Sequence, residues 1–134
     1  MDQQAWDTVG RLKEWLDEHD PAPEETHRTM RVLKLTEEIG EVAQAVMGAT
    51  GYGPRKGATH TWQDVEAELC DVMLTAMVAL RILTPDAQQI FATRFAHAVA
   101  LYEYAQVRGH AALGTDCVAV RLTSAYRSLP ASDE

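Results

Sequence analysis

The polar and apolar positions along the chain repeat with the period of α-helices. In the first segment, apolar residues recur at spacings of three and four, which puts them on one face of a helix. These residues are Trp6, Val9, Leu12, Trp15 and Leu16. The pattern predicts a first amphipathic helix over residues 2–19. The Asp20-Pro21-Ala22-Pro23 segment should end it, because proline interrupts a helix interior.

A second helix is predicted over residues 24–47. Pro23 followed by two glutamates is typical of a helix start, because proline fits the first turn and carboxylates favour the positive end of the helix dipole. The following apolar stripe is expected to face the core. Its members are Val32, Leu35, Ile39, Val42 and Val46. Four glycines and a proline then predict a loop over residues 48–60.

Two further helices are predicted after this loop. Thr61 and Asp64 have the spacing of a capping box, which predicts a third helix ending at Leu83. The Thr84-Pro85-Asp86 segment is another helix start and predicts a fourth helix over residues 85–107. We expect a short helix over residues 116–128 and a disordered tail at residues 130–134. With no strand pattern, the chain is predicted to be an all-α bundle with one domain over residues 1–129.

Composition narrows the possible functions. The 134 residues suffice for one domain. The formal net charge is −8, from 20 acidic and 12 basic residues, whereas a duplex-binding protein needs a cationic face, so we expect no nucleic-acid partner. The sequence has neither an apolar run of membrane-spanning length nor the cationic and apolar regions of a signal peptide. Two cysteines make no disulfide framework. We therefore expect a cytoplasmic protein without a membrane partner.

The candidate chemistry lies in acidic residues on the second and third predicted helices. Glu38 and Glu41 are three residues apart, so their carboxylates share a face. Glu68 and Asp71 repeat this spacing, and Asp71 lies in a stretch that is apolar on nearly every side from Leu69 onward, where we expect it to be buried. If the two helices pack antiparallel, four carboxylates meet. Such an all-oxygen set favours Mg²⁺, with Mn²⁺ as a substitute.

Groups that suit a nucleotide flank these acids. Magnesium held by few protein ligands typically completes its shell with water and substrate phosphates. Arg55 and Lys56 in the loop offer positive charge, and Trp62 offers a ring that can stack on a base. The alternatives are a solvated loop with Trp62 in the core, and a solvated acidic face with a surface pair between Lys34 and Glu38.

The acidic segments also carry a family resemblance. Glu37-Glu38-Ile39-Gly40-Glu41, then 26 residues, then Glu68-Leu69-Cys70-Asp71 resembles the EExxE…ExxD signature of the MazG-like all-α nucleotide pyrophosphohydrolases. The strings LTEEIGEVAQAV and DVEAELCDVMLTAMVAL also match the two helices of that family in apolar register. Together these motifs cover about the middle third of the chain, and either half alone would be a weak signal.

The resemblance implies a four-helix-type bundle, a homodimer or a dimer of dimers, that hydrolyses a ribo- or deoxynucleoside triphosphate to the monophosphate and diphosphate. Such an activity serves nucleotide-pool house-cleaning. The implied roles follow the motif: Mg²⁺ ligands at Glu38, Glu41, Glu68 and Asp71, a residue that positions or deprotonates the attacking water at Glu37, and a phosphate contact at Lys34. The apolar surface of the helices also favours self-association. The alternative function is a catalytically weak or inactive module that binds a nucleotide or a protein partner.

Overall fold

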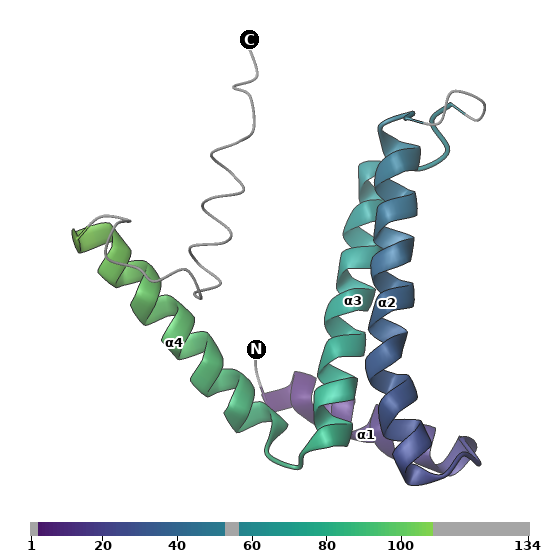
Figure 1. Ribbon diagram of the computed structural model, residues 1–134, viewed down its shortest axis with the longest axis vertical. Coiled ribbons are helices and arrows are strands. Elements are labelled where there is room, and N and C mark those ends of the chain that lie inside the picture. Colours follow the sequence, from purple (N-terminus) through teal and green to yellow (C-terminus); the bar gives the residue numbers. More distant parts are fainter. Residues whose placement is uncertain (1–2, 53–56, 109–134) are drawn as a thin grey trace. The chain divides into compact units, whose positions relative to one another are not determined.

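The computed structural model describes residues 3–52 and 57–108, and the regular structure in these ranges is helical (Figure 1). The helices are α1 (Gln3–His19), α2 (Glu24–Ala49), α3 (Trp62–Leu83) and α4 (Ala87–Arg108). The expected all-α class and the four main helices are confirmed. The predicted short helix, the tail, Arg55 and Lys56 lie outside the described residues. Among the described helices, none has both the length and the apolar character needed to cross a bilayer.

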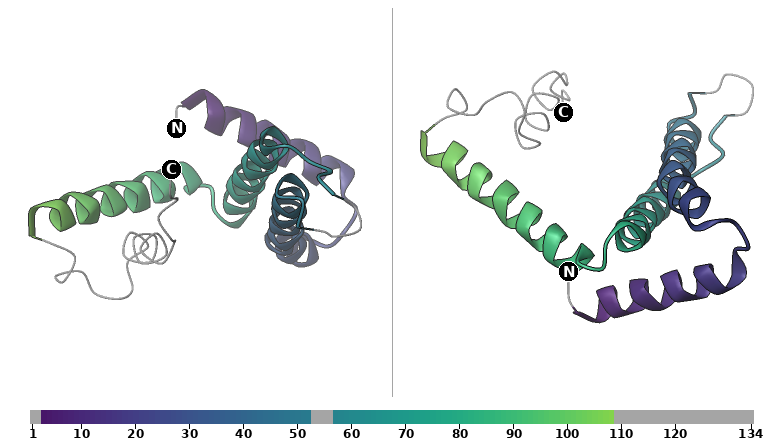
Figure 2. Two further views of the ribbon diagram at one scale, coloured as in Figure 1. Left: turned by 90° about the horizontal axis from the view of Figure 1, so that it is seen from above. Right: turned by 60° about the horizontal axis from the view of Figure 1, so that its bottom comes forward.

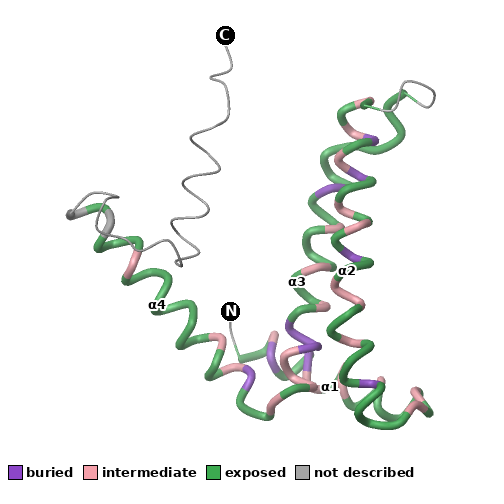
Figure 3. Tube along the Cα trace, viewed as in Figure 1, coloured by how far each residue is buried: buried purple, intermediate pink, exposed green. Residues whose placement is uncertain are grey.

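The chain divides into two compact units, the first ending at Ala87 and the second beginning at Gln88. In the first unit, α2 and α3 lie side by side as an antiparallel pair, and α1 packs against α3 (Figures 1 and 2). The core of this unit draws on α1, α2 and α3 and on Ala87, the first residue of α4, and Figure 3 shows how few positions are buried. Its buried apolar side chains are Trp6, Val9, Ala45, Val65, Met77, Val78, Ala79 and Ala87.

The start of α3 is determined by its first turn. The hydroxyl of Thr61 accepts a hydrogen bond from the backbone N–H of Asp64 at 3.3 Å, and the Asp64 carboxylate accepts one from the Thr61 backbone N–H at 2.7 Å. This reciprocal pair is the predicted capping box. The bond from the Thr61 backbone, together with a second bond from the Thr61 hydroxyl, lowers the pKa of Asp64, because both stabilise the charged carboxylate.

The side of α2 that meets α3 differs from the predicted apolar stripe. The buried residues of α2 are His27, Glu38, Ala45 and Gly48. The stripe is centred roughly a quarter turn away at 100° per residue. Two members of the stripe are exposed, Val32 and Ile39, the latter by 58%. The other three are half-buried: Leu35, Val42 and Val46. The predicted core-facing stripe is therefore wrong for this unit, because small residues and Glu38 occupy the contact line.

The expectation that α3 is buried from Leu69 onward is also wrong for this unit. Leu69 is exposed, Met73 is 56% exposed, and Asp71 is exposed as well. The reason is coverage: α2 lies along one side, and α1 contributes to the groove around Leu74 and Met77 in the second half of the helix. Part of the apolar surface of α3 therefore stays uncovered.

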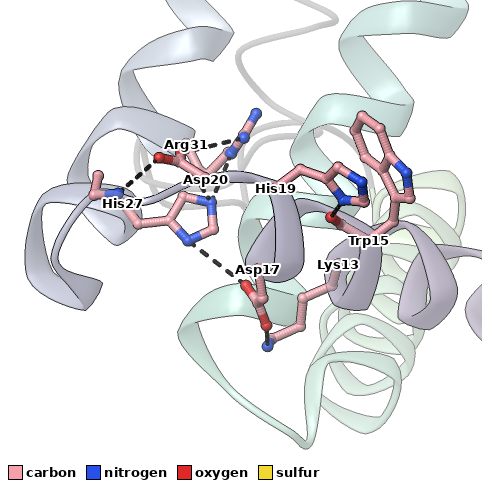
Figure 4. Close-up of polar contacts among 8 residues, drawn as sticks. Lys13, Trp15, Asp17, His19, Asp20, His27 and Arg31 are labelled. Atoms are coloured by element: carbon pink, nitrogen blue, oxygen red, sulfur yellow. Dashed lines mark hydrogen bonds and ion pairs between the residues drawn. The ribbon is translucent and has the colours of Figure 1, made fainter.

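A buried histidine joins the end of α1 to the beginning of α2 (Figure 4). Nε2 of His27 accepts a hydrogen bond from Nε of Arg31 at 3.0 Å. The carboxylates of Asp17 and Asp20 lie 3.6 Å from Nδ1 and Nε2, respectively. Nε2 accepts from Arg31, and Nδ1 lies on the side of Asp17. The network fixes the corner between the two helices. Sequence reasoning missed it, although His27 and Arg31 are spaced one helical turn apart.

Candidate metal centre

Three carboxylates from two helices converge between α2 and α3. One carboxylate oxygen from each of Glu38, Glu41 and Glu68 lies within 4.8 Å of the other two. Glu38 is 7% exposed, Glu68 is half-buried and Glu41 is exposed, so the cluster extends from the helix interface to its rim. The meeting of acids from the two predicted helices is thus observed for three of the four residues.

Asp71, the fourth predicted ligand, is not part of this group. It lies one turn after Glu68 on α3, and its side chain is exposed. Three residues of helix rotate its direction by about 60° from that of Glu68. The expectation of a buried Asp71 is wrong, because no helix of the first unit covers this flank of α3.

The ammonium of Lys34 bridges two of the predicted site residues. Its Nζ lies 2.9 Å from Oε2 of Glu37 and 3.1 Å from Oε1 of Glu38. The bond to Glu37 and then the bond to Glu38 raise the pKa of Lys34, since both stabilise the charged ammonium. The ion pair between Lys34 and Glu38 is present, as the alternative of a surface pair expected. Its acidic residue, Glu38, is buried and not at the surface.

The electrostatics of the cluster oppose the ionisation of Glu41. Partial desolvation raises the pKa of Glu41, and the charges of Glu38 and Glu68 raise it further. Lys34 acts in the opposite direction but does not cancel these effects. A cluster of this kind is stabilised by an added positive charge.

The donor set indicates which positive charge would fit. All three converging groups are carboxylates, and among the described residues neither a histidine nor a cysteine belongs to the group. Hard divalent cations prefer such oxygen ligands, whereas zinc prefers nitrogen and sulfur. The residues present therefore fit the Mg²⁺ or Mn²⁺ that the sequence predicts.

The connection after α2 folds back onto Gly48. The backbone N–H of Thr59 donates to the carbonyl of Gly48 at 3.1 Å. A Cβ at Gly48 would lie 2.2 Å from Nδ1 of His60, so a side chain there would displace the ring. Trp62 follows as the first residue of α3 and is 58% exposed, so the alternative that placed it in the core is wrong. Of the predicted nucleotide contacts, Lys34 and Trp62 are therefore the two within the described residues.

Comparison of the chain with protein-family models, curated proteins and solved structures gave no match. The functional conclusion accordingly depends on the geometry of the carboxylate cluster and on the motif resemblance.

Proposed function

We propose that this chain is a Mg²⁺-dependent nucleoside triphosphate pyrophosphohydrolase of the MazG-like type. The single observation behind the proposal is the convergence of Glu38, Glu41 and Glu68 within 4.8 Å. These residues come from two helices and occupy the motif positions that imply metal ligands. The proposed role is house-cleaning of the nucleotide pool in the cytoplasm, and Mn²⁺ is the proposed substitute metal.

Four residues are assigned to the metal: Glu38, Glu41, Glu68 and Asp71. The first three already converge. Asp71, exposed on the next turn of α3, is assigned as the fourth ligand on the motif alone. When bound, Mg²⁺ supplies positive charge against the phosphates and lowers the pKa of a coordinated water.

The remaining assigned residues handle the water and the substrate. Glu37 is exposed beside the cluster, and we assign it to orient the attacking water and accept its proton. The water oxygen bonds to the α-phosphorus, the bond from that phosphorus to the bridging oxygen breaks, and diphosphate leaves. Lys34 is assigned to a phosphate oxygen. Arg55, Lys56 and Trp62 are assigned to the rest of the nucleotide.

We also propose that two copies of the chain pair through the uncovered apolar side of α2 and α3. Val32 and Ile39 are exposed on α2, and Leu69 and Met73 are exposed on α3. Each residue of a helix is rotated by about 100° from the one before it. In an antiparallel pair this rotation puts the exposed apolar residues of α2 and those of α3 on the same side, opposite to Glu41. A contiguous apolar surface of this kind marks an interaction site. The proposed assembly is a homodimer or a dimer of dimers.

The deciding experiment measures the products from a panel of ribo- and deoxynucleoside triphosphates with Mg²⁺, Mn²⁺ or EDTA. We expect metal-dependent release of diphosphate and nucleoside monophosphate. The Glu68→Gln variant should lose both metal binding and turnover, since it removes the charge of a metal ligand and keeps a side chain of similar size. Glu66→Gln is the matched control, because Glu66 is exposed on the same helix and lies outside the cluster.

Each outcome has a defined meaning. Orthophosphate as the product, or turnover that survives in both Glu38→Gln and Glu68→Gln, would contradict the proposed mechanism. Metal binding without turnover of any nucleotide would favour the alternative of a binding module.

A further inference from the structure

Lys34 is a built-in counter-ion of the carboxylate cluster. Its Nζ lies 3.1 Å from Oε1 of Glu38, the most buried of the three converging acids. Lys34 itself is half-buried, so its ammonium reaches from the edge of the helix pair to a carboxylate in the interface. A buried carboxylate is costly without a partner, and this lysine supplies the partner.

A divalent cation at the cluster would compete with this ammonium. Glu38 is shared, because it contacts Lys34 and also converges with Glu41 and Glu68. A divalent cation and an ammonium about 5 Å apart repel each other even in water. This repulsion alone weakens the binding constant of the metal by more than about tenfold. The two cations therefore oppose each other at the same acid.

We propose that Lys34 is an exchangeable counter-cation, which neutralises Glu38 while the cluster is empty of metal and leaves Glu38 when a divalent cation binds. This inference rests on the proposed function, because it requires the cluster to bind Mg²⁺. Lys34 keeps its second contact, Oε2 of Glu37 at 2.9 Å, so it has an alternative position beside the cluster. Loading the metal then releases an ammonium for a phosphate oxygen, which couples metal binding to anion binding.

The opposite role for Lys34 makes a different prediction. A lysine that orients Glu38 for the metal would improve metal affinity, and its removal would weaken binding. A lysine that competes would lower metal affinity, and its removal would strengthen binding. The sign of the change in affinity therefore distinguishes the two roles.

The experiment titrates Mg²⁺ by calorimetry, and Mn²⁺ by the electron paramagnetic resonance signal of the free ion, into the full chain. The Lys34→Met variant removes the ammonium and keeps a side chain of similar length. We expect it to bind either metal about tenfold more tightly than the unaltered chain. The matched control is Lys13→Met, because Lys13 forms an ion pair with Asp17 one turn away on α1, outside the cluster. Its affinity should be unchanged.

Unchanged or weaker metal binding in Lys34→Met would overturn the counter-cation role and leave the metal centre in place. If both the unaltered chain and Lys34→Met fail to bind Mg²⁺ and Mn²⁺, the metal centre itself is refuted. If Lys34→Met fails to fold, the unaltered chain gives the answer by nuclear magnetic resonance. Saturating Mg²⁺ should then speed the exchange of the Lys34 ammonium protons with water. If the exchange rate of the Lys34 ammonium protons is unchanged when the metal is bound, the proposal that Lys34 leaves Glu38 is refuted.

Discussion

The ring of His60 lies directly against the α-carbon of Gly48. A Cβ at this position would be 2.2 Å from Nδ1 of His60 and 2.7 Å from Oγ1 of Thr59. Oγ1 of Thr59 lies 2.9 Å from Nδ1 of His60, and the backbone N–H of Thr59 donates a hydrogen bond to the carbonyl of Gly48. The last turn of α2 is therefore the surface on which the chain turns towards α3.

Gly48→Ala should destabilise the chain by about 1 kcal/mol, because the added methyl group displaces His60 and Thr59. The usual preference of a helix for alanine over glycine has the opposite sign. Gly40→Ala shows that preference alone, since a Cβ there meets nothing within 4 Å, and it should stabilise the chain by about 0.5–1 kcal/mol. Urea unfolding followed by circular dichroism measures both. A stabilised Gly48→Ala would mean that His60 moves away without loss.

Glu41→Gln should stabilise the metal-free chain at neutral pH. Desolvation, followed by the charges of Glu38 and Glu68, raises the pKa of Glu41 in the folded state. A raised acid pKa means that stability decreases as pH rises from the ordinary value of 4.5 through the raised value. Above that window the charged Glu41 opposes folding, and glutamine removes the charge. Below it, the two chains should be equally stable.

Thermal melts from pH 4 to pH 8 in the presence of a chelator test this prediction for Glu41. Glu66→Gln is the control, because Glu66 is exposed on the same helix as Glu68 and lies outside the cluster. Added Mg²⁺ should reduce or reverse the advantage of Glu41→Gln, because the metal supplies the missing charge. A destabilised Glu41→Gln at neutral pH without metal would contradict the electrostatic account of the cluster.

Thr61→Ala should lower the free energy of unfolding by about 1 kcal/mol, because the backbone N–H of Asp64 loses its acceptor. Part of the pH dependence should remain, since the Thr61 backbone N–H still bonds to Asp64 and this bond is the main cause of its lowered pKa. The contribution of Asp64 to stability is present above its ordinary pKa of 3.8 and is lost as pH falls through the lowered value.

Urea unfolding at pH 7 and pH 2.5 checks the prediction for Thr61. Thr29→Ala is the matched control, because the hydroxyl of Thr29 is exposed on α2 and bonds to the backbone of its own helix. That change should stay within about 0.5 kcal/mol. Equal losses in the two variants would show that the capping box contributes nothing special.

Met73→Lys should dissociate the proposed dimer, because it places a charge on the apolar side of the helix pair. Met30→Lys is a closely matched control: both methionines are 56% exposed, and helical rotation puts Met30 on the opposite flank of α2. Sedimentation velocity should give a smaller particle for Met73→Lys and an unchanged one for Met30→Lys. A monomeric unaltered chain, or equal behaviour of the two variants, would contradict the proposed interface.

Local chemistry made the helix ends predictable. Pro23 precedes α2 in the structure as in the sequence pattern, and the reciprocal bonds between Thr61 and Asp64 open α3 at the expected residue. These signals depend on residues within one turn, so they need no knowledge of packing. The convergence of Glu38 with Glu68 was predictable for a related reason: helical spacing selects the face, and the acids meet once the two helices pack antiparallel.

The packing faces were not predictable from the same patterns. Periodicity finds the apolar stripe that includes Ile39, but not whether the unit itself covers that stripe. Ala45 and Gly48 are buried, and the lack of a side chain at Gly48 lets the following loop approach α2 closely. The unit therefore buries this face of α2 and leaves part of the more apolar stripe uncovered. Asp71 was misplaced for the same reason, since a helix with apolar residues on all sides is buried only if enough partners surround it.

The position of the carboxylate cluster along α2 bears on how this chain can be altered. Glu38 is about 21 Å from the first residue of α2 and about 16 Å from the last, at 1.5 Å of rise per residue. The geometry of the acids therefore depends on two regular helices and not on the segment that connects them. Small changes of length in that segment should leave the acids in register, provided that the packing of Thr59 and His60 on Gly48 and the capping box at Thr61 are kept.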